Sequence, residues 1–131
     1  MFTKEQIELA HRKVKSGADF SKYVKEIKEM GVKSHEVVLL DGTWIFKGAN
    51  ETAVKFQKGL TNVHIATQSD PKQFKQILTN HQNGETDYPT FCMQAGESGV
   101  ERWFSDFEQM TVTYLDSNGD IVAVEPIPSI E

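Results

Sequence analysis

The chain has 131 residues, of which 38% are hydrophobic and 25% are charged, a composition typical of one globular domain that folds without disulfides or metals. Its 14 basic and 19 acidic side chains give a formal net charge of −5, which argues against a nucleic-acid-binding surface because phosphates require a positive field. The single cysteine excludes an intramolecular disulfide. We expect one cytoplasmic domain over residues 1–131, because a lone thiol suits a reducing compartment and the sequence shows neither a signal peptide nor a membrane-spanning stretch.

The first thirty residues predict two helices joined by a short turn. Thr3 and Gln6 have the spacing of a capping box, and Ser16-Gly17 is expected to end the first helix. Asp19 can cap a second helix whose apolar residues recur at helical spacing, and Gly31 suits its C-terminus.

A β-hairpin is predicted for residues 35–47, where the hydrophobic period changes to two. Asp41-Gly42 lies at its centre, and this dipeptide favours a two-residue type I′ turn. With such a turn, Leu40 would pair with Thr43.

The rest of the chain predicts a second pair of helices and further strands. Asp70-Pro71 opens a helix that ends near Gly84, and Asp87 can cap a shorter helix over residues 88–97. Further strands are expected at residues 52–56, 62–66, 100–107, 110–115 and 121–125. The fold class is therefore α+β, with a largely antiparallel sheet of six to seven strands packed by two helical hairpins. Four helices on one face would leave the other face open, so a homodimer through a sheet face or edge is expected.

The two halves of the chain, residues 1–66 and 67–131, follow the same plan of two helices, a Gly-Val pair and antiparallel strands. The segment from Asp19 to Val32 aligns without a gap on the segment from Asp87 to Val100, 68 positions later (87 − 19). The first helix aligns on the third at an offset of 67. This pattern indicates an internal duplication, and convergence of two helical hairpins is the alternative.

In this alignment, His81 and Cys92 occupy the positions of Val14 and Val24, so both are expected to point inward. A cysteine close to a histidine can act as an activated nucleophile, and Asp87 or Asp106 is a candidate to orient the imidazole. The alternative is that Cys92 packs as a small hydrophobic residue while His81 bonds to a nearby backbone group. No cysteine-protease or redox signature surrounds Cys92, which favours packing.

No metal or cofactor site is predicted. The histidines fall on different expected elements and lack paired metal-ligand spacing: His11, His35, His64 and His81. The chain also has no glycine-rich phosphate loop.

The second half carries three runs of residues that match a known family: His81-Gln82-x-Gly84-x-Thr86-Asp87-Tyr88-x-Thr90-Phe91-Cys92, then Gly99-Val100-x-Arg102-Trp103-x-x-Asp106, then Thr113-Tyr114 with Val124-Glu125. Over about residues 18–128 the chain resembles the YbcV-like family of small bacterial and prophage proteins, which often carry the label "phage envelope protein". The resemblance implies a compact α+β domain with no assigned activity, and it supplies no catalytic residues. Within these runs, Tyr88, Arg102 and Trp103 are candidates for binding, with packing as the alternative for Trp103.

The sequence therefore favours a non-enzymatic binding or interaction protein, for which the resemblance suggests a prophage origin. Its partner would be a second copy or an unidentified protein, and neither a membrane nor a nucleic acid is expected. The alternative is a small enzyme or ligand pocket that uses Cys92 with His81.

Overall fold

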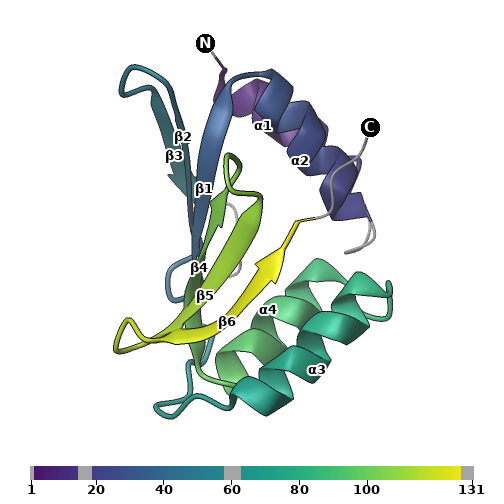
Figure 1. Cartoon of the computed structure of the whole chain (residues 1–131), viewed down its shortest axis with the longest axis vertical. Coiled ribbons are helices and arrows are strands. Elements are labelled where there is room, and N and C mark those ends of the chain that lie inside the picture. The colour runs from purple at the N-terminus through teal and green to yellow at the C-terminus, as the bar shows by residue number, and fades with distance from the viewer. Residues whose placement is uncertain (1, 15–18, 58–62, 128–131) are drawn as a thin grey trace.

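The computed structural model describes residues 2–14, 19–57 and 63–127, which form four helices and a six-stranded antiparallel sheet (Figure 1). The α+β fold predicted from the sequence is confirmed. The helices are α1 (Lys4–His11), α2 (Phe20–Glu29), α3 (Pro71–Gln82) and α4 (Tyr88–Glu97). The strands are β1 (Val32–Val38), β2 (Thr43–Gly48), β3 (Ala53–Gln57), β4 (Val100–Asp106), β5 (Thr111–Asp116) and β6 (Ile121–Pro126).

Three of the four described helix starts follow from the capping chemistry of the sequence. Thr3 and Gln6 form the complete capping box at the start of α1. Asp70 and Asp87 each accept a hydrogen bond from the backbone N–H three residues later, at 3.0 and 2.9 Å. The predicted cap at Asp19 is wrong: Asp19 precedes α2 with helical backbone angles, and its side chain makes no capping hydrogen bond. The first helix ends at His11, earlier than expected, and Ser16-Gly17 lies outside the described residues.

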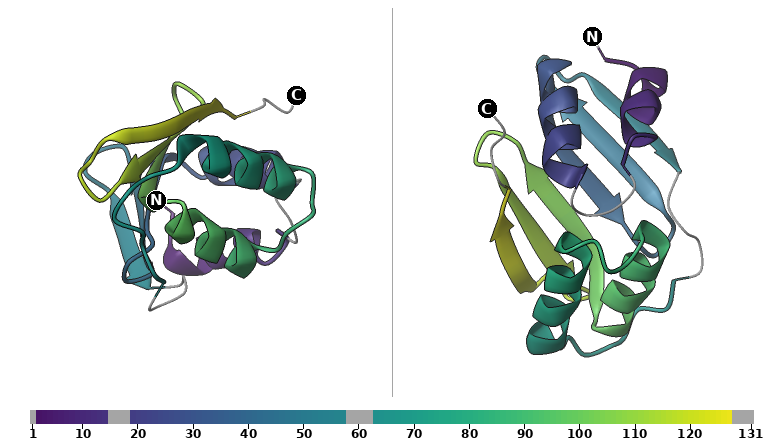
Figure 2. Two further views of the ribbon diagram at one scale, coloured as in Figure 1. Left: turned by 90° about the horizontal axis from the view of Figure 1, so that it is seen from below. Right: turned by 90° about the vertical axis from the view of Figure 1, so that its right-hand side faces the viewer.

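The strands lie in the order β3-β2-β1-β4-β5-β6, and every neighbouring pair is antiparallel. Both helix pairs cover the same face of this sheet, and no described segment covers the opposite face (Figure 2). The core therefore lies between the sheet and the helices. Its largest fully buried side chains are Trp44, Phe46, Phe74 and Phe107.

The predicted register of the first hairpin is wrong. Val38, and not Leu40, pairs with Thr43, so that four residues form the loop. The backbone N–H of Leu39 donates to the carbonyl of Glu101 at 2.8 Å, and the Leu39 side chain is buried while Leu40 is exposed. Leu39 therefore bonds to the residue before Arg102 on β4 and does not pair with β2. The shift is two residues, which keeps each side chain on its predicted face.

The strand predicted at residues 62–66 is not present in its described part. Residues 63–66 run as irregular backbone over the C-terminal end of α4, where the N–H of Ala66 donates to the carbonyl of Gly96 at 2.9 Å. The backbone N–H of Ala66 is therefore satisfied by a helix end and not by a neighbouring strand. Residue 62 lies outside the described residues.

The two halves meet along β1 and β4 in a pseudo-twofold pattern. Glu36 lies opposite Phe104, its equivalent at the offset of 68 (104 − 36). The hydrogen bond from Leu39 N–H to the Glu101 carbonyl has its counterpart in the bond from Phe107 N–H to the Lys33 carbonyl at 3.0 Å. This arrangement supports the predicted duplication.

Candidate functional site

Cys92 lies in the second turn of α4 and is 1% exposed. Burial raises the pKa of its thiol to about 12, and the neighbouring Tyr88 hydroxyl only partly offsets this increase. A reactive cysteine needs a lowered pKa and access for its substrate. Cys92 has neither in this conformation.

His81 lies in the last turn of α3. Its ring stacks on Phe91, with centroids 4.4 Å apart, and its Nδ1 lies 3.1 Å from both the carbonyl and the hydroxyl oxygen of Thr86. Burial lowers the pKa of His81, against smaller opposing effects of Thr86 and Asp87. The imidazole thus joins α3 to the corner before α4. The structure does not bring the predicted pair of His81 and Cys92 together as a catalytic dyad.

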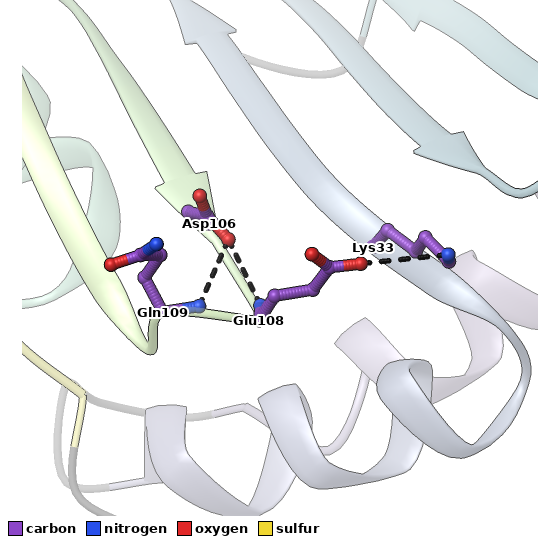
Figure 3. A network of polar contacts seen from close by, with 4 residues as sticks. All are labelled: Lys33, Asp106, Glu108 and Gln109. Carbon is purple, nitrogen blue, oxygen red and sulfur yellow. Dashed lines mark hydrogen bonds and ion pairs between the residues drawn. The ribbon is translucent and has the colours of Figure 1, made fainter.

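Asp106 ends β4 and caps the turn that follows (Figure 3). One carboxylate oxygen accepts hydrogen bonds from the backbone N–H groups of Glu108 and Gln109, at 2.9 and 3.1 Å. Beside it, Lys33 forms an ion pair with Glu108 at 3.5 Å. Asp106 therefore has a local structural partner and does not orient His81.

Arg102 and Trp103 point to opposite faces of β4. Trp103 is 7% exposed and packs against Phe91 and Tyr114, with ring centroids 5.5 and 5.7 Å away. Arg102 lies on the uncovered face, where its guanidinium is 3.5 Å from a carboxylate oxygen of Glu36. Of the two predicted binding residues, only Arg102 lies on a face where a partner could reach it.

Tyr88, the third predicted binding residue, lies in a cluster of polar aromatic side chains that sequence reasoning missed. We call His11, Tyr23, His35, Trp44 and Tyr88 the core polar cluster. The ring of Trp44 lies 4.8 Å from His11, 5.2 Å from His35 and 5.8 Å from Tyr88, and His11 lies 5.5 Å from Tyr23. These side chains come from α1, α2, β1, β2 and α4, so only the tertiary fold unites them.

The titratable groups of Tyr23, His35 and Tyr88 are buried and uncharged at neutral pH. Burial, and then the nearby His11, lowers the pKa of His35 to about 3. Burial also raises the pKa of Tyr88 well above its usual range, and the Cys92 thiol adds to this effect. Four buried polar atoms of the cluster have no hydrogen-bond partner of normal geometry: Tyr23 Oη, His35 Nε2, Trp44 Nε1 and Tyr88 Oη. The Trp44 indole and the Cys92 thiol lie near the Tyr88 hydroxyl and affect its pKa.

One sequence signal could have found this cluster. His35 is in phase with Val37 and Leu39 on the buried face of β1, and His11 is one helical turn from Ile7. A polar aromatic side chain at an inward position must have a partner or remain unsatisfied. The sequence reasoning judged the histidines only for metal-ligand spacing, so it did not identify His35 as a buried polar side chain. Within the described ranges, no three histidine, cysteine or acidic side chains gather as metal ligands.

The second candidate surface is the uncovered side of the sheet, which we call the open face. Its main side chains alternate with the buried ones along the strands: Ser34, Glu36, Val38, Ile45, Lys47, Lys55, Arg102, Phe104, Asp106, Thr113, Leu115, Ile121 and Val124. Exposed apolar side chains concentrate on β4 and β6, where Phe104 is 38%, Val124 55% and Ile121 64% exposed.

A family model described as "Protein of unknown function (DUF1398)" matches residues 8–126. The chain belongs to this family. The match confirms the expectation of an uncharacterised family, while the narrower YbcV-like name rests on the resemblance alone. No curated protein matches the chain. In the part of the chain that the structure describes, no helix is long and apolar enough to cross a membrane.

Proposed function

We propose that this protein is a non-enzymatic interaction protein and that it binds a second copy of itself through the open face. The observation that carries the proposal is the uncovered side of a six-stranded sheet whose helices all lie on the other side (Figure 2). An antiparallel sheet can have one face in water, but that face is then usually polar. Here it carries large apolar side chains.

These apolar side chains are neighbours across the strands and form a continuous stripe. Phe104 lies opposite Thr113, which lies opposite Val124 on the edge strand. In the next row, Leu115 lies opposite Ile121. A contiguous exposed apolar patch marks an interaction surface more often than a scattered set does, because burying it removes apolar area from water.

The charges of the open face favour a second copy as the occupant. Lys47 and Lys55 lie on the strands of the first half, while Asp106 lies on the first strand of the second half. Glu36 and Arg102 also lie on this face, and they form an ion pair with each other at 3.5 Å. A twofold axis parallel to the strands would stack β1 of one copy on β4 of the other. Lys47 would then approach the partner's Asp106, and the apolar stripe of each copy would cover the first half of the other. Two sheets packed in this way form a sandwich with an isologous interface.

The other expectations fit this proposal with less force. The YbcV-like resemblance supports a prophage-derived interaction role, and the single thiol supports a cytoplasmic location. The alternative of a thiol enzyme loses support from the separate environments of Cys92 and His81. Nucleic-acid binding loses support from the net charge of −5.

The oligomeric state measured by light scattering or sedimentation tests the proposal. We expect the wild-type chain to be a dimer and both Phe104→Lys and Val124→Lys to shift it towards monomer. Leu9→Lys is the matched control, because Leu9 is equally exposed, at 58%, but lies on α1 away from the open face. A wild-type chain that stays monomeric at its highest soluble concentration would exclude the dimer. Equal dissociation by the Leu9 variant would exclude the open face as the interface.

A further inference from the structure

We propose that the core polar cluster is a binding site for a small molecule that accepts hydrogen bonds, of the class of small carboxylic acids. The site lies on the helix-covered side of the sheet, so it is independent of the dimer proposed for the open face. Its recognition groups are Tyr23, His35, Trp44 and Tyr88, and His11 packs among them.

The first observation is that four polar atoms from four elements are buried without partners. Tyr23 and His35 are each 5% exposed and Trp44 is 2% exposed, and the hydroxyl oxygen of Tyr88 is also buried. Proteins satisfy the large majority of their buried polar groups, so an unsatisfied group calls for an explanation. Four such groups around linked aromatic rings point to one shared partner more than to four separate defects.

The second observation is an internal comparison between the halves. At the offset of 68, Tyr23 corresponds to Phe91, and Trp44 corresponds to Val112. The second half thus packs the same positions without the hydroxyl and without the indole N–H, and both of its side chains are buried. The architecture does not need polar groups at these two places, although the position of His35 is occupied in the second half by Trp103, which is buried and also carries a ring N–H. Their presence in the first half has to be explained by something other than packing.

The chemistry of the cluster selects an acceptor. The Trp44 indole can only donate, both tyrosine hydroxyls can donate, and the neutral His35 imidazole can donate from one ring nitrogen. The carboxylate that acts on Tyr23 is Glu26, and it is already paired with Lys13 at 2.6 Å. A small acid would bring two oxygen acceptors, and its proton could be shared with an imidazole.

A hollow of about 160 Å³ lies beside Tyr23, between α1 and α2. Its lining includes Ala10, Val14 and Tyr23 together with two basic and two acidic side chains: Lys13, Lys22, Asp19 and Glu26. Tyr23 belongs both to this hollow and to the core polar cluster. We infer that a rotation of its ring would connect the two, and Lys22 at the outside is balanced by nearby carboxylates, so entry would not depend on a basic funnel.

Titration with acetate and benzoate, followed by NMR of the tryptophan indole N–H signals, tests the proposal. Trp103→Phe assigns the two indole signals, since the chain has two tryptophans. We expect a saturable shift of the Trp44 signal and little change at Trp103. Tyr23→Phe and Tyr88→Phe each remove one donor with minimal change of shape, and we expect each to weaken the apparent affinity at least several-fold.

Tyr114→Phe is the matched control. It also removes a buried tyrosine hydroxyl, but that hydroxyl donates to Glu125 outside the cluster, so the affinity should stay unchanged. Equal shifts at both indoles, or equal weakening by the control, would overturn the proposal. So would a Trp44 indole that exchanges magnetisation with ordered water and does not respond to either acid.

Discussion

At the scale of single residues, Cys92 and Val24 occupy equivalent places in α4 and α2 and are 1% and 0% exposed. A free cysteine that replaces valine at such a position behaves as a small hydrophobic side chain. The neighbouring Tyr88 hydroxyl does not change this, because burial dominates the pKa of the thiol. Residue type alone suggested reactivity, and burial decides against it.

We therefore predict that Cys92 resists alkylation in the native protein. Its thiol has a pKa of about 12, so the thiolate that attacks the reagent is scarce at pH 8, and its side chain is 1% exposed. Iodoacetamide labelling followed by mass spectrometry should be slow in buffer and become fast in denaturing urea. Fast native labelling with an apparent pKa below the ~8.5 of free cysteine would contradict the assignment.

His35 gives a second prediction, which concerns acid stability. Its folded-state pKa of about 3 lies below its ordinary value of 6.5, so the unfolded chain binds the proton first as the pH falls. The stability that the neutral imidazole contributes is therefore complete above pH 6.5 and decreases between pH 6.5 and 3. The decrease reaches about 1.4 kcal/mol per pH unit for one such group.

Urea unfolding of the wild type and of His35→Phe at pH 7 and pH 4.5 measures this effect. We expect the wild type to lose about 2–3 kcal/mol more than the variant over this range. His64→Gln is the control, because His64 is an exposed histidine outside the core polar cluster. Parallel pH profiles of wild type and His35→Phe would show that His35 titrates normally.

At the scale of elements, the segment of residues 63–66 shows how a neighbour can override a pattern. Its alternation of Val63 and Ile65 predicts a strand, yet it packs on the end of α4. The fit is close, because a Cβ added to Gly96 would lie 2.3 Å from the carbonyl oxygen of His64 and 2.8 Å from Val63 Cγ1.

Gly96→Ala should consequently destabilise the protein by roughly 1–3 kcal/mol through overpacking. Helix propensity alone predicts the opposite sign, a gain of about 1 kcal/mol. Chemical denaturation distinguishes the two outcomes. Gly119→Ala serves as the comparison, because Gly119 has open space around it and a φ of +82°, so only backbone strain applies there. A stabilised Gly96 variant would mean that residues 63–66 do not contact α4.

At the scale of the whole molecule, the two halves contact each other through the central strands β1 and β4, which pair with each other. β1 and β4 have matching bounds at the offset of 68, and so do α2 and α4 as well as β2 and β5. Because β1 and β4 are antiparallel, equivalent residues come together at one point, where Glu36 faces Phe104. A gene duplication followed by fusion of a strand-paired dimer would give this geometry.

A disulfide across this point tests the arrangement. We expect Glu36→Cys with Phe104→Cys, in a Cys92→Ala background, to oxidise readily within one chain, because directly opposed residues of antiparallel strands lie close enough for a disulfide. Closing this loop should stabilise the protein by up to about 4 kcal/mol in the chain-entropy model. The pair of Glu36→Cys with Thr113→Cys, one strand further away, is the control that should not close. Efficient closure of the control would refute the strand order.

The sequence by itself determined three of the four described helix starts, the alternation along the six strands and the alignment of the two halves. Thr3, Asp70 and Asp87 act on N–H groups three residues away, so their effects can be read locally. Only the tertiary structure decided the hairpin register, because the hydrogen bond from Leu39 to Glu101 competes with the turn. It likewise decided the surroundings of Cys92 and His81. It also assembled the core polar cluster and left the open face uncovered. These features depend on contacts between residues far apart in the chain, and local propensity carries no information about such contacts.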